Sequence, residues 1–265
     1  MRLFLFALFS LLLTAPISAQ NIRITLDPEL PAEIQQTMQE LSERAITQYQ
    51  RTFGFDFPHG LEIVVSASAD FLARDYTQHL GGSLASKRRA FQEWIYAEAT
   101  FSRVYVNTSH QAFHTPSSPG VNFHREAMLL HELFHVLQYQ LSGSVGRNCC
   151  PESATPRVGP VWMLEGGANY AQQHISGQLS GYLSWARQNA AAPSSQLLRS
   201  IEGRRGINQA RMGYDSGAIA IDLLVGRAGV ERLVAFYSAI GATQDWRAAF
   251  SETFGMTIDQ FYESL

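Results

Sequence analysis

Charged residues are scarce in this chain of 265 residues, and no basic stripe is present. They make up 16% of the sequence, with 20 Lys and Arg against 23 Asp and Glu, for a formal net charge of -3. The densest basic run is Lys87-Arg88-Arg89, and a run this short is typical of a solvated helix face. A protein that binds nucleic acid needs cations along the phosphate backbone, so this composition argues against that class. The hydrophobic share of 46% is that of a globular protein.

Cysteine is almost absent, which excludes a disulfide framework. The two that occur, Cys149 and Cys150, are adjacent. The Cα atoms of neighbouring residues lie about 3.8 Å apart, closer than an ordinary bridge allows. A strained ring between them, an intermolecular link and two free thiols all remain open. A metal-chelating pair is the weakest of the alternatives.

No apolar run long enough to cross a membrane is present, and the longest one lies at the start of the chain. Residues 1–19 combine Arg2, an apolar run from Leu3 to Leu13, Pro16 and a small residue at Ala19. This pattern predicts a secretory signal peptide, cleaved before Gln20. We therefore expect a mature protein that is exported, to the periplasm or out of the cell, and that has no stable membrane insertion.

Hydrophobic periodicity predicts an α+β protein, since an early helix and two strands precede a mostly helical remainder. No repeat, low-complexity segment or linker divides residues 20–265, so we expect one domain. Its N-terminal part, 20–141, would be a small mixed helix and strand subdomain, and 142–265 would be helical. The predicted strands are 61–66 and 103–107, and the predicted helices are 28–53, 69–80, 122–141, one starting near 160, 180–189, 214–227, 229–240, 244–254 and 257–264.

The pentad His131-Glu132-Leu133-Phe134-His135 is the strongest chemical signal in the chain. Side chains four residues apart share one face of a helix, so the two imidazoles can bind one zinc ion. Between them, Glu132 can serve as general base toward a water molecule at the metal. Leucine and other apolar residues surround these polar groups, and burying them without a metal or partners would be costly.

A catalytic zinc site needs a third protein ligand. One standard continuation of the pentad has Gly and then His at the positions held here by Gln138 and Leu141, so that class is excluded. Glu152 and Glu165 compete for the role. We favour Glu165, because it lies on a predicted helix whose small residues 166–168 allow close packing against the pentad helix, whereas Glu152 lies in a loop.

The pentad together with Trp162-x-x-Glu165-Gly166-x-Ala168 resembles the gluzincin zinc peptidases, especially their peptidase MA-like domains. The segments from Tyr214 to Ala220 and from Ala249 to Phe261 are also similar, so the resemblance spans roughly residues 123–263. It implies a gluzincin-like fold in which an edge strand, here expected at 103–107, lies over a zinc site and pairs with an extended peptide.

The resemblance also implies the roles of the site residues. His131, His135 and Glu165 would ligate one Zn²⁺, and Glu132 would polarise the water. Tyr214 would donate a hydrogen bond to the oxyanion, although a core aromatic at the start of a helix is an equal alternative. Asn169, one turn after Glu165, would orient a ligand histidine, although an asparagine on a helix surface is the commoner interpretation.

The expected function is zinc-dependent hydrolysis of peptide bonds in a peptide or protein substrate. The Gly-x-Met-Glu-Asn motif of the related aminopeptidases is absent, which favours an endopeptidase. Two alternatives remain: a catalytically silent zinc-containing binding or cell-surface module, and a zinc hydrolase of a non-peptide amide or ester. Glu132 argues against the silent module, because a purely structural metal site needs no general base.

Overall fold

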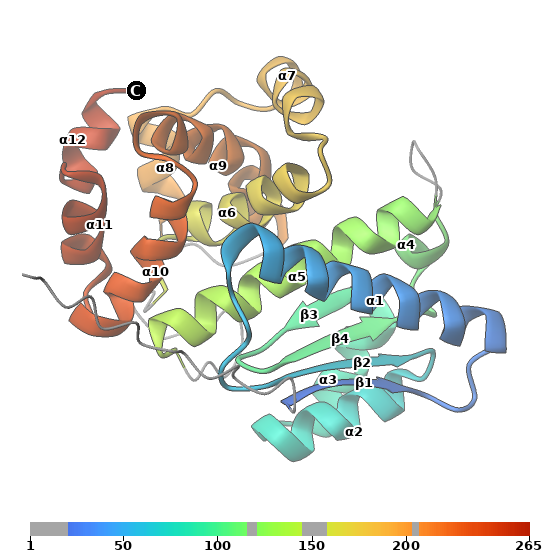
Figure 1. Cartoon of the computed structure of the whole chain (residues 1–265). Helices are drawn as coiled ribbons and strands as arrows, with labels where there is room; N and C mark the ends of the chain where they lie inside the picture. Colours follow the sequence, from blue (N-terminus) through green and yellow to red (C-terminus); the bar gives the residue numbers. More distant parts are fainter. Residues whose placement is uncertain (1–20, 116–120, 145–157, 203–206) are drawn as a thin grey trace, which may run out of the picture.

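A computed structural model describes residues 21–115, 121–144, 158–202 and 207–265, and it has an α+β architecture (Figure 1). Its sheet has four strands in the order β1-β2-β4-β3. The strands are β1 (Ile22–Leu26), β2 (Leu61–Ser66), β3 (Ala97–Ala99) and β4 (Arg103–Asn107). β1, β2 and β4 are parallel, with Ile24 opposite Ile63 and Ile63 opposite Val104, while β3 is antiparallel to β4.

Helices cover both faces of the sheet, which explains why β2 is buried along its whole length. On one face α1 (Ala32–Phe53) and α5 (Val121–Ser142) pack in the main core with Ile63 and Val104. On the other face α2 (Ala69–Leu80) and α3 (Leu84–Glu93) enclose a smaller cluster around Val64 and Tyr105. Neighbouring residues of a strand point to opposite faces, so Ile63 and Val64 belong to different clusters.

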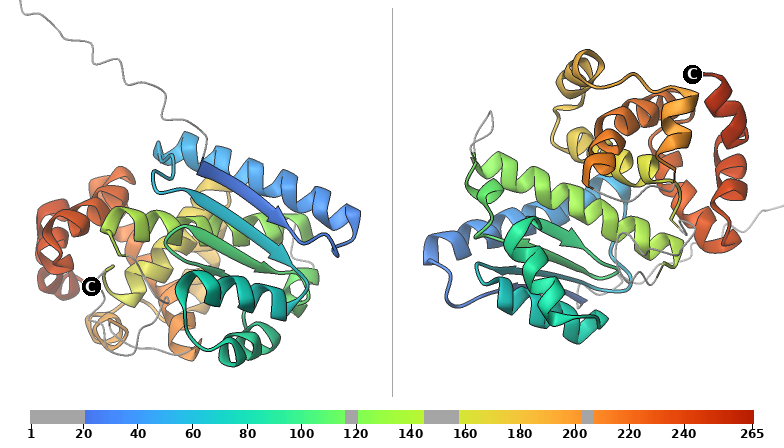
Figure 2. Two further views of the ribbon diagram at one scale, coloured as in Figure 1. Left: turned by 90° about the horizontal axis from the view of Figure 1, so that it is seen from below. Right: turned by 180° about the vertical axis from the view of Figure 1, so that it is seen from behind.

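The rest of the described chain is helical and packs on the side of α5 away from the sheet (Figures 1 and 2). Trp162 of α6 is fully buried, stacks on Phe261 and donates a hydrogen bond to Tyr262 at 3.0 Å, which ties α6 to the C-terminal helix. The main hydrophobic cluster runs from α1 through α5 to this last helix. The helices are α6 (Val161–Ile175), α7 (Leu179–Asn189), α8 (Ser195–Ser200), α9 (Ile207–Ala228), α10 (Glu231–Thr243), α11 (Trp246–Phe254) and α12 (Ile258–Glu263).

The strand at 103–107 is not the edge strand that we expected. It is β4, and it lies between β2 and β3. A turn after Ala99 folds the chain back, with Thr100 and Arg103 joined by a backbone hydrogen bond, so that the short strand β3 covers the outer side of β4. The edge on this side of the sheet is therefore Ala97–Ala99. A strand of three residues is too short to show the alternation that reveals strands in a sequence.

Several other boundaries differ from the expectation. The first helix, expected from residue 28, begins at Ala32, after Pro31. The Asp27 carboxylate before it accepts hydrogen bonds from the Glu29 backbone and the Ser66 hydroxyl. The helix expected from 214 begins at Ile207. β1, α3, β3, α4 (Gln111–His114) and α8 were not predicted.

Some expectations concern segments outside the described residues. These are the signal peptide over 1–19, the state of Cys149 and Cys150, and the competing ligand Glu152. Among the helices that the structure describes, none combines the length and the apolar character needed to span a lipid bilayer.

Candidate metal centre

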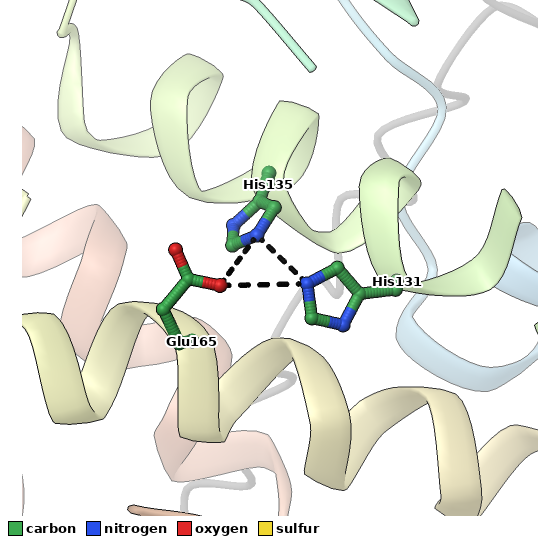
Figure 3. Close-up of side chains that lie close together, drawn as sticks. All are labelled: His131, His135 and Glu165. Carbon is green, nitrogen blue, oxygen red and sulfur yellow. Dashed lines mark hydrogen bonds and ion pairs between the residues drawn. The ribbon is translucent and has the colours of Figure 1, made fainter. Parts of the chain in front are cut away.

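Two helices bring a pair of histidines and a carboxylate to one point (Figure 3). His131 and His135 come from consecutive turns of α5, and Glu165 comes from α6, which faces them. The two Nε2 atoms lie 3.1 Å apart, and Glu165 Oε2 lies 3.5 Å from His131 Nε2 and 3.4 Å from His135 Nε2. Among the described residues, this is the group whose types and spacing could hold a metal ion.

The spacing of these atoms matches that of zinc ligands. Donors about 2.0–2.2 Å from a tetrahedral zinc ion lie roughly 3.3–3.6 Å from one another. Two of the three separations, 3.4 and 3.5 Å, fall in this range, and the third, 3.1 Å, is slightly shorter. Glu165 Oε2 is also buried and accepts no hydrogen bond from the described residues, so it is an acceptor without a donor.

Amide groups hold the outer nitrogen of each imidazole. His131 Nδ1 lies 3.0 Å from Asn169 Oδ1, and His135 Nδ1 lies 2.7 Å from Gln138 Oε1. An amide oxygen can only accept, so in both neutral rings the proton is on Nδ1 and the lone pair on Nε2. The centre therefore contains three converging acceptors, and only a cation placed among them relieves their mutual repulsion.

The pKa values of the two buried groups, His135 and Glu165, show the same demand for positive charge. Burial alone would lower the pKa of His135, but the attraction of Glu165 raises it to about 9. Burial alone would raise the pKa of Glu165, yet His135 and His131 hold it well below its usual range. A site that holds a proton this strongly when free of metal presents an ionised carboxylate and basic nitrogens to a divalent ion.

Glu132 lies on α5 beside His131 and is half-buried. The pKa of its carboxyl group is shifted in the opposite direction to that of Glu165. Burial raises its pKa, the two histidines lower it, and the charges of Glu165 and Glu98 raise it further, so the net shift is upward. A carboxylate with a raised pKa accepts a proton more readily near neutral pH, which is the property that a general base needs.

Tyr214, on α9, is in contact with one of the two histidines. Its ring packs edge-to-face on His131, with 5.6 Å between the ring centroids. The structure thus brings Tyr214 to the same cluster as the three candidate ligands, as it does Asn169. Their roles as oxyanion donor and as orienting residue stay predictions.

Glycines set the position of α6. A Cβ atom on Gly167 would come within 3.2–3.4 Å of Phe134 and Gln138 of α5, so this residue allows the close approach that we expected. Gly166 serves a different contact. A Cβ atom there would lie 2.3 Å from the backbone of Gly217, so Gly166 lets α6 cross α9. The two neighbouring glycines thus fit α6 between the helix of the histidines and the helix of Tyr214.

Two residues that support His135 were missed by reasoning from the sequence. Gln138 was considered only as a departure from another zinc motif, whereas its Oε1 contacts His135 and its Nε2 donates to the Leu164 carbonyl and to Tyr237. The Tyr237 hydroxyl in turn donates to the Met163 carbonyl at 3.0 Å. Gln138 comes three positions after His135, a spacing that the sequence does show, but nothing in the sequence indicates that Tyr237 of α10 lies here.

Comparisons of the whole chain gave no matching family model, no matching curated protein and no matching solved structure.

Proposed function

We propose that this protein is a zinc-dependent endopeptidase. The observation that carries the proposal is the convergence of His131, His135 and Glu165, three acceptors spaced as zinc donors, with Glu132 beside them. Two imidazoles and one carboxylate are a donor set of catalytic zinc, which keeps a further position for water or substrate. Bound there, zinc supplies a Lewis acid that polarises the substrate carbonyl and makes water more acidic.

The residues of the chain supply the proton transfers and the orientation. Glu132 removes a proton from the attacking water as the new C–O bond forms, and it returns that proton to the amide nitrogen as the C–N bond breaks. Tyr214 donates a hydrogen bond to the oxygen of the scissile carbonyl, on which negative charge develops. Asn169 and Gln138 hold the two imidazoles with Nε2 directed inward.

The edge of the sheet supports a peptide as the substrate. On either side of β3, Tyr96 and Thr100 form backbone hydrogen bonds with β4, so by antiparallel alternation the N–H and C=O groups of Ala97 and Ala99 point away from β4. Ala97 and Ala99 also pack in the core that contains α5. An extended peptide can add to such an edge with main-chain hydrogen bonds, which gives affinity for peptides without fixing their side chains.

The direction of Glu98 supports cleavage within a chain rather than at its amino terminus. This is the carboxylate of β3, and it forms an ion pair with Lys87 of α3 at 2.6 Å. Its cross-strand neighbour Tyr105 belongs to the cluster on the α2 and α3 side of the sheet. The Glu98 side chain therefore lies on the face of the sheet opposite α5, and β3 has no other carboxylate that could bind a free amino group.

Glu132→Gln tests the proposal, because glutamine keeps the shape of the side chain and cannot accept the proton. We expect the purified variant to retain one zinc per chain and to lose cleavage of a mixed peptide library. Glu126→Gln is the matched control, since Glu126 lies on the same helix and pairs with Arg44 at the surface. This control should cleave as the wild type does.

Three results would contradict the proposal, and two of them would indicate another function. Undiminished cleavage by Glu132→Gln would contradict the mechanism. A wild-type protein that holds zinc but cleaves no peptide would indicate the silent binding module. Hydrolysis of small esters or amides without hydrolysis of peptides would indicate the non-peptide hydrolase.

A further inference from the structure

A chain of hydrogen bonds runs from His131 through three further helices to Asp215. Its first link joins His131 Nδ1 of α5 to Asn169 Oδ1 of α6 at 3.0 Å. From the same amide, Nδ2 donates to the Tyr182 hydroxyl of α7 at 3.1 Å. The Tyr182 hydroxyl donates to Asp215 Oδ1 of α9 at 2.6 Å. Asp215 thus lies beside Tyr214 in the sequence and is linked to a candidate zinc ligand through two intermediates.

The charge at the end of this chain sets the direction of every bond in it. The Asp215 carboxylate can only accept hydrogen bonds, so the Tyr182 hydroxyl uses its single proton in the hydrogen bond to Asp215. The Tyr182 oxygen then has only acceptor capacity for Asn169, and the amide must turn its nitrogen toward the tyrosine and its oxygen toward His131. His131 must therefore carry its proton on Nδ1, which leaves the Nε2 lone pair facing Glu165 and His135.

Without the Asp215 carboxylate, the hydrogen bonds of the chain can also run in the opposite direction. The Tyr182 hydroxyl can then donate to Asn169, and the reversed amide presents its nitrogen to His131. In that arrangement Nδ1 becomes an acceptor, the proton moves to Nε2, and the ring can no longer bind a cation at the centre. Burial and the hydrogen bond to Asp215 raise the pKa of Tyr182 far above its usual value, so its hydroxyl keeps its proton.

The other histidine has no such dependence. His135 contacts Gln138, whose amide nitrogen donates to the Leu164 carbonyl and thereby directs its oxygen toward the ring. A backbone carbonyl fixes that amide regardless of any charge. The two candidate ligands are therefore oriented by different means, and only His131 relies on a distant carboxylate.

We propose that Asp215 and Tyr182 are positioning residues for His131, and that they hold it in the form that binds the metal. The inference rests on the proposed zinc site, but not on the reaction that the site performs. The chain places the negative charge two side chains away from the imidazole. His131 thereby gains a fixed direction, while no additional charge lies next to the metal ligands.

Zinc affinity measures this role without any assay of activity. We expect Tyr182→Phe to raise the zinc dissociation constant, measured by chelator competition, by about 10- to 100-fold, the usual effect of losing such a partner. Asp215→Asn should also raise the zinc dissociation constant. Tyr105→Phe is the matched control, because Tyr105 also donates to an aspartate, Asp75 at 3.0 Å, but lies in the α2 and α3 cluster.

A double variant separates positioning from a merely structural role. Asn169→Asp combined with Asp215→Asn moves the charge next to His131. The new carboxylate at position 169 then accepts from the ring and from Tyr182, and the new amide at position 215 donates to Tyr182. This exchange should lower the zinc dissociation constant from the raised value of Asp215→Asn back toward that of the wild type. The absorption spectrum of the Co²⁺-substituted protein should change in Tyr182→Phe and return toward that of the wild type in the double variant.

The outcomes distinguish this inference from the proposed function. If the wild type binds no zinc, the proposed metal site is wrong. If the wild type binds zinc and Tyr182→Phe binds it as Tyr105→Phe does, the metal site stands and the positioning chain is refuted. If the double variant binds no better than Asp215→Asn, fixing the orientation of His131 does not restore zinc binding, and the inference is also overturned.

Discussion

Two glutamates within one site have opposite tendencies toward protons. Glu165 faces both histidines, and its pKa is held well below its usual range, so it stays ionised as a metal ligand must. Glu132 is adjacent to His131 in the chain, but burial outweighs the attraction of the histidines and its pKa is raised. Environments that shift the pKa values of two carboxyl groups in opposite directions favour different roles, which supports the proposal that Glu165 is a ligand and Glu132 a base.

Tyr214→Phe tests the predicted role of this tyrosine. The variant keeps the ring that packs on His131 and loses only the hydroxyl. If the hydroxyl stabilises the developing oxyanion, kcat should fall by about 10²- to 10³-fold while zinc content and melting temperature stay unchanged. The measurement is kcat on a peptide that the wild type cleaves. An unchanged kcat would show that Tyr214 is a core aromatic.

At the scale of elements, α6 determines whether the site can form. It carries Glu165 and Asn169, and it must approach α5 closely for these residues to reach the histidines, while it also crosses α9. Gly166 and Gly217 make the crossing with α9 possible, since a Cβ atom at either position would lie within 2.3–2.4 Å of backbone in the other helix. Backbone cannot rotate aside as a side chain can, so this contact tolerates no larger residue.

Gly166→Ala should therefore destabilise the protein, even though alanine is the better helix former. We expect a loss of about 1–3 kcal/mol in the free energy of unfolding from overpacking, together with weaker zinc binding as Glu165 shifts. Gly181→Ala is the matched control, because Gly181 lies in α7 and a Cβ atom there would meet open space. That variant should gain roughly 0.5–1 kcal/mol. Urea unfolding compares them, and equal effects would refute the tight crossing.

At the scale of the whole molecule, the candidate metal centre joins two parts of the chain. Its histidines lie on α5, which packs on the sheet, and its carboxylate lies on α6, among the C-terminal helices (Figures 1 and 3). A zinc ion bound by all three would cross-link these parts. The native state would then be stabilised by the binding free energy, and the unfolded chain would not.

Removal of zinc should accordingly lower the melting temperature of the whole protein. At a free zinc concentration about a thousandfold above the dissociation constant, the ion contributes about 4 kcal/mol of stability. Thermal unfolding with and without chelator measures the loss, and Glu132→Gln should show the same loss because it keeps every ligand. A melting temperature that chelator leaves unchanged would contradict a zinc ion shared between α5 and α6.

Local spacing made part of this protein predictable. A period of 3.6 residues places His131 and His135 on one face of a helix wherever that helix lies, and α5 formed nearly as expected. Small residues after Glu165 correctly indicated close packing of its helix. The long elements were found for the same reason, since each carries enough repeats of its own hydrophobic pattern to be recognised.

Contacts between distant segments decided the rest. The sequence could not show that β3 covers β4, because the pairing of a three-residue strand depends on the turn that folds it back. Nor could it show that Tyr182, Asp215 and Tyr237 stand behind the histidines, because hydrogen bonds between helices depend on how the helices cross. The sequence by itself determined the ligand types and their helical spacing. The tertiary structure decided which strand forms the edge of the sheet and which amide contacts each imidazole.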